Sequence, residues 1–285
     1  KDSYLFKSDY SKLLCSLIIF LSPIMNFEIW LNAINLQVYL GILTVIIFFL
    51  KDNKNINIFR LIILTISGLS GVYSCALTPI FLYKFYKLKN IYNGTCALIL
   101  GLCALTQTYL IYKTWFIVEG SANTSLTFIF TKYEAISYLY NVIIRPFFGS
   151  SLPTMVLGFL NLDLYIVLTN TIITNYMFLI TIFLFCILLF ISLAFIKSIN
   201  EKKDLYVVYN LIVLFLIFSF LVIFGGISDS IHGRYSTLPG FVLVIFVLFF
   251  TSTNTKKIIK YFSIFLIFST LFFGSIDYRY KKFIY

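Results

Sequence analysis

The sequence predicts an all-α, polytopic integral membrane protein, and two observations carry that prediction. Of the 285 residues, 60% are hydrophobic and only 12% are charged, with a mean hydropathy of +0.97. Several apolar runs reach the length of about 20 residues that a helix needs to cross a bilayer. We expect about seven to nine membrane helices, including a possible re-entrant pair, and interfacial helices on the outer face.

The charge pattern separates a membrane protein from a nucleic-acid-binding protein. The net charge is +11, but the Lys and Arg residues fall in short loops between apolar runs. That placement follows the positive-inside rule and does not form a basic groove, so we expect a lipid bilayer as partner and no nucleic acid. We expect the protein to be located in the bacterial cytoplasmic membrane.

The cysteines and the chain start complete the compositional picture. All five cysteines lie inside apolar runs without a CxxC or Cys/His spacing, so they indicate buried small side chains and no metal site. A divalent metal remains an open possibility for the cofactor. The chain begins with Lys1 and has no signal-peptide pattern. We therefore expect a single transmembrane domain, 1–285, that is the C-terminal portion of a longer protein.

The first apolar runs cover residues 13–25 and 36–50, with a polar turn between them. Residues 61–83 are long enough for one span, but the glycines of GLSG (68–71) interrupt them and basic clusters flank both ends. Two half-helices of about 10 and 18 Å would return the chain to the same side. A single span with close packing at the glycines is the alternative, and both interpretations remain open.

Further along, 95–112 is predicted as a span and 113–175 as an external interfacial insertion. Within the insertion, the aromatic-rich segment 126–148 is expected to lie along the interface, with Arg145 near its end. A second interfacial or partly inserted helix is expected at 155–168. The remaining predicted spans are 176–196, 205–225, 239–252 and 258–275.

A short polar loop before the span at 239–252 is the best functional lead. It holds Asp229, the only histidine, His232, and Arg234. Pro239 suits the first turn of the following helix, with Ser236 or Thr237 as its cap. A helix start presents free N–H groups and a positive dipole end, so Arg234 before it predicts an anion site. The alternative is that Arg234 snorkels to headgroups or pairs with Asp229.

The half-helix interpretation also decides the predicted topology. It places most of the Lys and Arg residues in cytoplasmic loops, as the positive-inside rule requires. Glu28, the interfacial insertion and the loop bearing His232 and Arg234 then share the outer face. We therefore expect the functional site on that face.

Three segments carry a resemblance to known proteins. NFEIWLNAINLQVYLGIL (26–43) resembles a turn-and-helix segment of uncharacterised bacterial polysaccharide-cluster membrane proteins. ISGLSGVYSCALTPIFL (66–82) resembles the Gly-rich broken segment of the GT-C superfamily of membrane glycosyltransferases. HGRYSTLPGFVLVIF (232–246) is similar to the arginine-tyrosine-proline segment of the same superfamily. Together these pieces cover about a third of the chain.

The resemblance implies an enzyme that passes a sugar from a polyprenyl-phosphate carrier to an acceptor on the outer face. Arg234 and His232 would hold the carrier phosphate, with Tyr235 beside them. The lysine usual in the Gly-rich segment has no counterpart here, and the catalytic carboxylate is expected upstream of Lys1. Further candidates for substrate binding are Arg145, Gln37 and Asn35.

The chemistry of the transfer defines the remaining candidates. A leaving phosphate needs cations or a helix N-terminus, and an acceptor hydroxyl needs a general base. Candidate carboxylates within the chain are Glu28, Asp229 and Glu119. The leading hypothesis is an inverting glycosyltransferase that acts on a cell-surface glycan or lipid. The alternatives are a polysaccharide polymerase or ligase, and a transporter or flippase of lipid-linked sugars, for which broken helices are typical.

Overall fold

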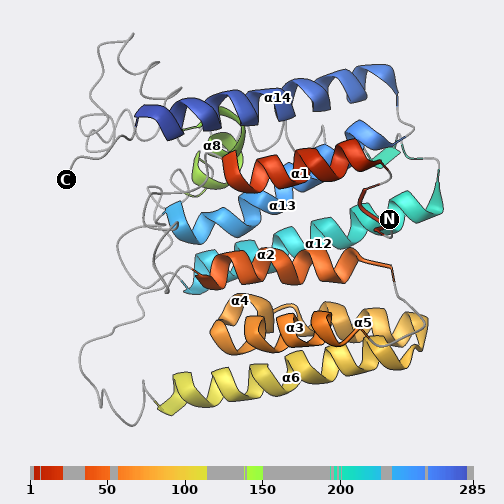
Figure 1. Ribbon diagram of the computed structural model, residues 1–285, viewed down its shortest axis with the longest axis vertical. Coiled ribbons are helices and arrows are strands. Elements are labelled where there is room, and N and C mark those ends of the chain that lie inside the picture. The colour runs from red at the N-terminus through yellow and green to blue at the C-terminus, as the bar shows by residue number, and fades with distance from the viewer. Residues whose placement is uncertain are drawn as a thin grey trace. The chain divides into compact units, whose positions relative to one another are not determined.

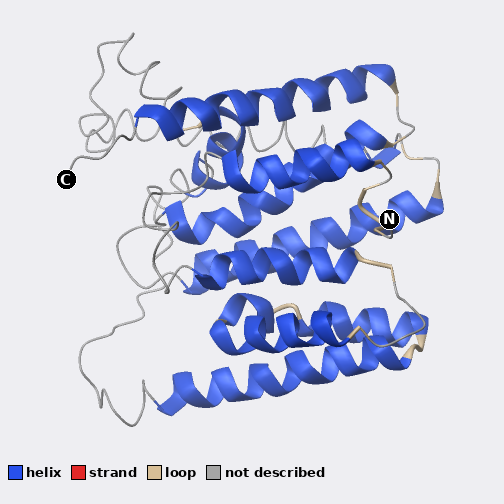
Figure 2. Ribbon diagram, viewed as in Figure 1, coloured by secondary structure: helices blue, strands red, loops and turns tan. Residues whose placement is uncertain are grey.

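The structure is a computed structural model, and its secondary structure is drawn in Figure 2. It describes residues 3–6, 8–21, 36–51, 57–113, 138, 140–149, 193, 196–197, 199, 201–225, 233–253 and 256–280. The described residues form helices and connecting turns, without a β-strand, as the sequence predicts. The chain divides into two compact units, which we describe separately.

Unit 1 consists of residues 1–5 and 28–127. Its helices are α2 (Leu36–Phe49), α3 (Ile58–Ser70), α4 (Val72–Cys75), α5 (Thr78–Leu88) and α6 (Ile91–Tyr112). Within this unit, α3 and α5 form the two limbs of a hairpin that packs against α2 and α6 (Figure 1). The predicted span at 95–112 is confirmed as α6, whereas the apolar run at 36–50 forms α2, a helix of 14 residues that is shorter than a candidate span.

The hairpin bends at Gly71, whose backbone is fully extended (φ 176°, ψ 169°). The axes of the two limbs differ by 117°, so the chain turns back instead of continuing across. The sequence predicts a break over residues 68–71, but the helix is interrupted only at Gly71. Gly68 lies inside α3, where its lack of a side chain lets α6 approach closely. A Cβ at Gly68 would lie 2.7 Å from the Cβ of Cys103.

The two limbs of the hairpin begin and end beside the same end of α2. At the start of α3, Arg60 Nη1 donates to the Lys51 carbonyl at 3.1 Å. From α5, Lys84 Nζ donates to the carbonyls of Phe48 at 2.9 Å and Leu50 at 3.4 Å. Both basic flanks therefore lie at one end of unit 1. This agrees with the two-limbed interpretation, and the bent pair is either a broken span or a re-entrant loop.

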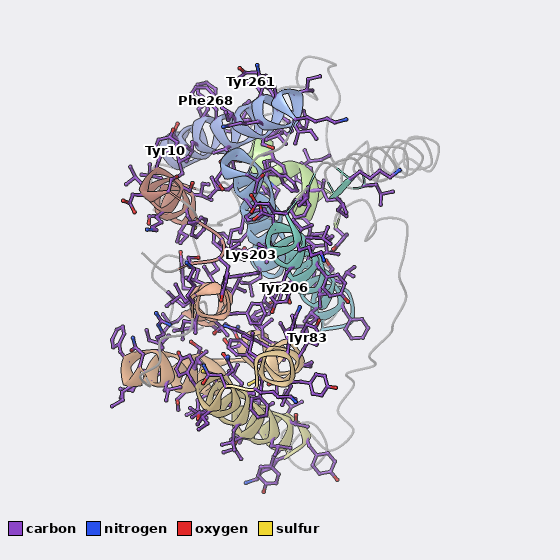
Figure 3. All side chains as sticks on the ribbon, turned by 90° about the vertical axis from the view of Figure 1, so that its right-hand side faces the viewer. Tyr10, Tyr83, Lys203, Tyr206, Tyr261 and Phe268 are labelled. Atoms are coloured by element: carbon purple, nitrogen blue, oxygen red, sulfur yellow. The ribbon has the colours of Figure 1, made fainter. Side chains whose placement is uncertain are left out.

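Unit 2 consists of residues 6–27 and 128–285. Its helices are α1 (Asp9–Leu21), η4 (Tyr140–Ile144, a π-helix), α8 (Arg145–Phe148), α12 (Lys202–Gly225), α13 (Gly233–Ser252) and α14 (Lys257–Tyr280). Within this unit, α13 packs against α12, α14, α1 and the η4–α8 segment. It is the core element: Val242, Leu248 and Phe250 are fully buried. By contrast, α14 exposes Tyr261 and Phe268 (Figure 3), as a lipid-facing helix does.

The start of α13 differs from the prediction. The helix begins at Gly233, so Pro239 lies in its interior, and Ser236 and Thr237 are helical residues. The placement of Pro239 in the first turn is therefore wrong. Proline is tolerated inside membrane helices because neighbouring groups satisfy the carbonyl that its ring leaves free. As a consequence, Arg234 belongs to the first turn of α13 and not to a loop before the helix.

The described end of the predicted interfacial segment 126–148 also differs from expectation. Asn141, Val142, Arg145 and Phe147 are all buried, where a helix lying on the interface would leave one face open. The physical reason is tertiary: the η4–α8 segment packs against α13 and α14. An aromatic-rich sequence has the same composition on an interface and in a protein core.

Three described helices are long and apolar enough to cross a membrane: α6, α12 and α14. A fourth is obtained if the bent pair is one span. The predicted spans at 205–225 and 258–275 are thus confirmed, but the total of seven to nine is not. The predicted helix at 155–168 lies outside the described residues, and so does the one at 176–196 except for residues 193 and 196. The single domain and the external insertion stay predictions.

Candidate functional site

The strongest candidate site in unit 2 is built around a buried arginine on the η4–α8 segment. The five residues of η4 form one π-helical turn, and α8 continues it with Pro146 in its first turn. Gly149 ends the segment with a positive φ of 67°, which glycine adopts without strain. Single π-turns inside helices occur often at functional positions. Arg145 is the residue at which the π-helix becomes an α-helix.

Arg145 is only 7% exposed although it carries a full charge. Its Nη1 donates to Asn141 Oδ1 at 3.2 Å, four residues earlier and on the same helical face. The adjacent Val142 and Phe147 are buried apolar side chains. Placing a guanidinium in such surroundings is costly, and ionisable side chains in membrane helices usually belong to functional sites.

Contacts to the long helices fix the position of this segment. Ser269 Oγ on α14 donates to the Phe147 carbonyl at 2.8 Å, and the rings of Phe148 and Phe273 lie 6.1 Å apart, edge to face. The Tyr138 hydroxyl forms a short hydrogen bond with Ser219 Oγ on α12. The backbone that carries Arg145 is therefore held from two sides, which is the preorganisation that a binding group requires.

Within unit 2, α8 lies toward the end where α13 begins and α14 finishes (Figure 1). The first turn of α13 contains Arg234 and Tyr235. The segment with Arg145 and the helix start with Arg234 thus belong to the same half of the unit. The side chains of Arg234 and Tyr235 lie outside the described part of the chain, and so do His232 and Asp229 entirely.

The other predicted site residues are distributed differently. Gln37 is in the first turn of α2, in unit 1, where it packs against the hairpin bend: a Cβ on Gly71 would overlap its carboxamide. Glu28, Asn35 and Glu119 lie outside the described residues. The structure therefore does not bring Gln37 into the unit that contains Arg145.

The hairpin tip in unit 1 is a second polar cluster. Side chains of the same unit donate hydrogen bonds to the carbonyls at the end of α3. Ser70 Oγ donates to the Ser67 carbonyl at 2.9 Å, and Cys75 Sγ to the Gly68 carbonyl at 3.0 Å. Gln107 Nε2 on α6 donates to the Leu69 carbonyl at 2.6 Å. The last carbonyls of α3, which have no partner within the helix, thus accept hydrogen bonds from side chains of the same unit.

Three of these residues are not predicted from the sequence as members of a site. Asn141 precedes Arg145 by four positions, a helical spacing that could have identified it. Gln107 is a carboxamide inside an otherwise apolar span, which is also a readable signal. Ser67 carries no such signal, because serine is common in membrane helices.

These clusters contain no recognisable metal site in the described part of the chain, and no similar protein assigns a function to them. Among the residues that the structure describes, no three His, Cys, Asp or Glu side chains lie close enough together to hold a metal ion. Comparison of the chain with protein-family models, with curated proteins and with solved structures finds no match. The resemblance to the GT-C superfamily therefore stays an interpretation of the sequence motifs.

Proposed function

We propose that this chain is the membrane-embedded part of a glycosyltransferase that takes its sugar from a polyprenyl-phosphate carrier. The observation that supports the proposal is the buried guanidinium of Arg145, held on a fixed π-turn in an apolar unit. Guanidinium groups bind phosphate through paired, charge-assisted hydrogen bonds.

In this mechanism Arg145 binds the carrier phosphate and stabilises the negative charge that grows on it as the sugar leaves. Arg234, at the positive end of the α13 dipole, supplies a second cation from the same half of unit 2. The acceptor hydroxyl needs a general base, and Asp229 is the candidate carboxylate that belongs to unit 2. The acceptor is a glycan or lipid at the outer face.

The test measures binding and transfer on the same variants. The chain, reconstituted in lipid nanodiscs, is titrated with undecaprenyl phosphate, and transfer of radiolabelled hexose from the polyprenyl-phosphate-linked form to a membrane extract is followed. We expect Arg145→Gln to weaken carrier binding by about 10- to 100-fold, the worth of a charge-assisted hydrogen bond. Arg145→Lys should retain part of the affinity.

The matched control is Lys203→Gln, which removes an exposed cation at the start of α12 (Figure 3). Its affinity should equal that of the wild type. Equal binding by Arg145→Gln and the wild type would reject the proposal. Chain lengthening of a polymeric acceptor in the transfer assay would identify a polymerase or ligase instead.

A transporter or flippase of lipid-linked sugars is the second candidate, and the 117° bend in the hairpin favours it. Movement of the sugar-linked carrier between leaflets of a proteoliposome, without transfer of the sugar, would establish this function.

A further inference from the structure

The end of unit 1 that contains residues 51–60 and 84–89, which we call the basic end, carries a concentrated positive charge. These two segments hold six Lys and Arg residues and one acid, Asp52. Hydrogen bonds to the carbonyls at the end of α2 bring both segments together there. The part of unit 1 that the structure describes contains no Asp or Glu, so no described carboxylate neutralises this charge.

Three lysines of the basic end are exposed. Lys51 follows the end of α2, and Lys87 and Lys89 lie where α5 ends and the chain turns into α6. Lys87 Nζ is 5.9 Å from the centre of the Tyr83 ring. The backbone N–H of Lys89 donates to the Phe85 carbonyl at 2.7 Å, which fixes the turn. The three ammonium groups are therefore presented to the surroundings at one end of the unit.

The start of a membrane span places these lysines at the depth of the lipid headgroups. The candidate span α6 begins at Ile91, and Lys87 and Lys89 precede it by about one turn. Phe59 is 70% exposed at the same end, and Tyr86 and Ile91 are each 78% exposed. Basic and aromatic side chains exposed together at the end of a span are typical of the membrane–water interface. A soluble anion would neutralise the lysines but leave these apolar side chains in water, whereas a lipid covers both.

We infer that the basic end of unit 1 binds the headgroups of anionic phospholipids, with Lys51, Lys87 and Lys89 in contact with the headgroup phosphates. Each lysine near an anionic membrane surface contributes about a fivefold preference for such lipids over zwitterionic ones. Three lysines therefore predict a preference of at least about tenfold after screening by salt. The surface is separate from Arg145, which belongs to unit 2.

The test measures which lipids lie beside the basic end, by the quenching of a local tryptophan. Trp30→Phe and Trp115→Phe remove both native tryptophans, and Tyr86→Trp supplies the reporter. The chain is reconstituted into phosphatidylcholine bilayers with increasing fractions of dibrominated phosphatidylglycerol, and the quenching gives the relative affinity of the two lipids at that position. Tyr109→Trp is the matched reporter, because Tyr109 is 61% exposed near the opposite end of α6. At that end, Lys113 is the one cation in the described part of unit 1.

At the Tyr86→Trp reporter we expect phosphatidylglycerol to be preferred by about tenfold or more, and at the Tyr109→Trp reporter by less. The combined changes Lys51→Gln, Lys87→Gln and Lys89→Gln should abolish the preference at the first reporter. Arginine at the same three positions keeps the charge and should keep the preference.

Three results would overturn the inference. The first is an equal preference at the two reporters, and the second is a preference that survives the glutamine changes or is lost with arginine. The third is loss of the preference when soluble glycerol phosphate is added in excess, which would assign the lysines to a free anion. The measurement involves neither the polyprenyl carrier nor Arg145, so failure here is distinguishable from failure of the proposed transferase.

Discussion

The two units handle buried charge in different ways. In unit 1, the buried ammonium of Lys84 donates to two carbonyls at the end of α2 and lies 5.5 Å from the centre of the Phe48 ring. In unit 2, the buried guanidinium of Arg145 bonds to the neutral carboxamide of Asn141. The first cation neutralises the negative end of a helix dipole. Lys84 therefore maintains the hairpin, whereas Arg145 is the cation for which we propose a role in binding.

The largest expected effect on stability is that of Lys84→Met. It removes two charged hydrogen bonds and leaves the carbonyls of Phe48 and Leu50 without that donor. We expect a loss of about 3 kcal/mol in the free energy of unfolding, measured by thermal unfolding in detergent. Lys87→Met on the same helix is the control, because Lys87 is exposed. Equal stability of the two variants would remove the structural role assigned to Lys84.

The second expected effect concerns the close approach of the hairpin and α6. In Gly68→Ala, the new methyl group would overlap Cys103, and we expect a loss of about 2 kcal/mol from overpacking. Gly101→Ala on α6 is the matched control, since its Cβ would meet only Thr78 Cγ2, at 3.8 Å. Combining Gly68→Ala with Cys103→Gly should restore part of the loss. Equal melting temperatures for the two alanine variants would show that the hairpin can move away from α6.

A smaller effect is expected for the carboxamide that caps α3. Gln107→Leu deletes the hydrogen bond to the Leu69 carbonyl and should cost about 1 kcal/mol in thermal unfolding. Thr108→Val is the control, since the Thr108 hydroxyl bonds only to the carbonyl of Ala104 in its own helix. If Gln107→Leu melts no earlier than Thr108→Val, water replaces the cap without loss.

The smallest change in stability, and the sharpest contrast with Lys84, is expected for Arg145→Met. An apolar side chain of similar length avoids the desolvation of the guanidinium, so the unfolding free energy should stay within about 1 kcal/mol of the wild type or rise. Binding of undecaprenyl phosphate should nevertheless be lost. If Arg145→Met unfolds as readily as Lys84→Met but still binds the carrier, Arg145 has a structural role and not the proposed role in binding.

Part of the fold and of the site is readable without coordinates. The apolar runs located α2, α6, α12 and α14, because a helix in lipid must be apolar over a length that the bilayer fixes. The basic flanks of the hairpin favoured a turned-back chain for a physical reason, the cost of moving many cations across a membrane. Arg145 was a candidate from its residue type and its neighbourhood.

The sequence by itself therefore determined the environment of this protein, because its hydropathy requires a bilayer. The position and length of each apolar run also determined where the helices lie. Tertiary structure decided which polar groups meet. Gln37 and Gln107 reach the same bend from separate helices, Lys84 reaches the end of α2, and Pro239 lies inside a helix instead of at its start. Such pairings depend on side-chain contacts between residues far apart in the chain, and hydropathy, being a local property, contains no information about them.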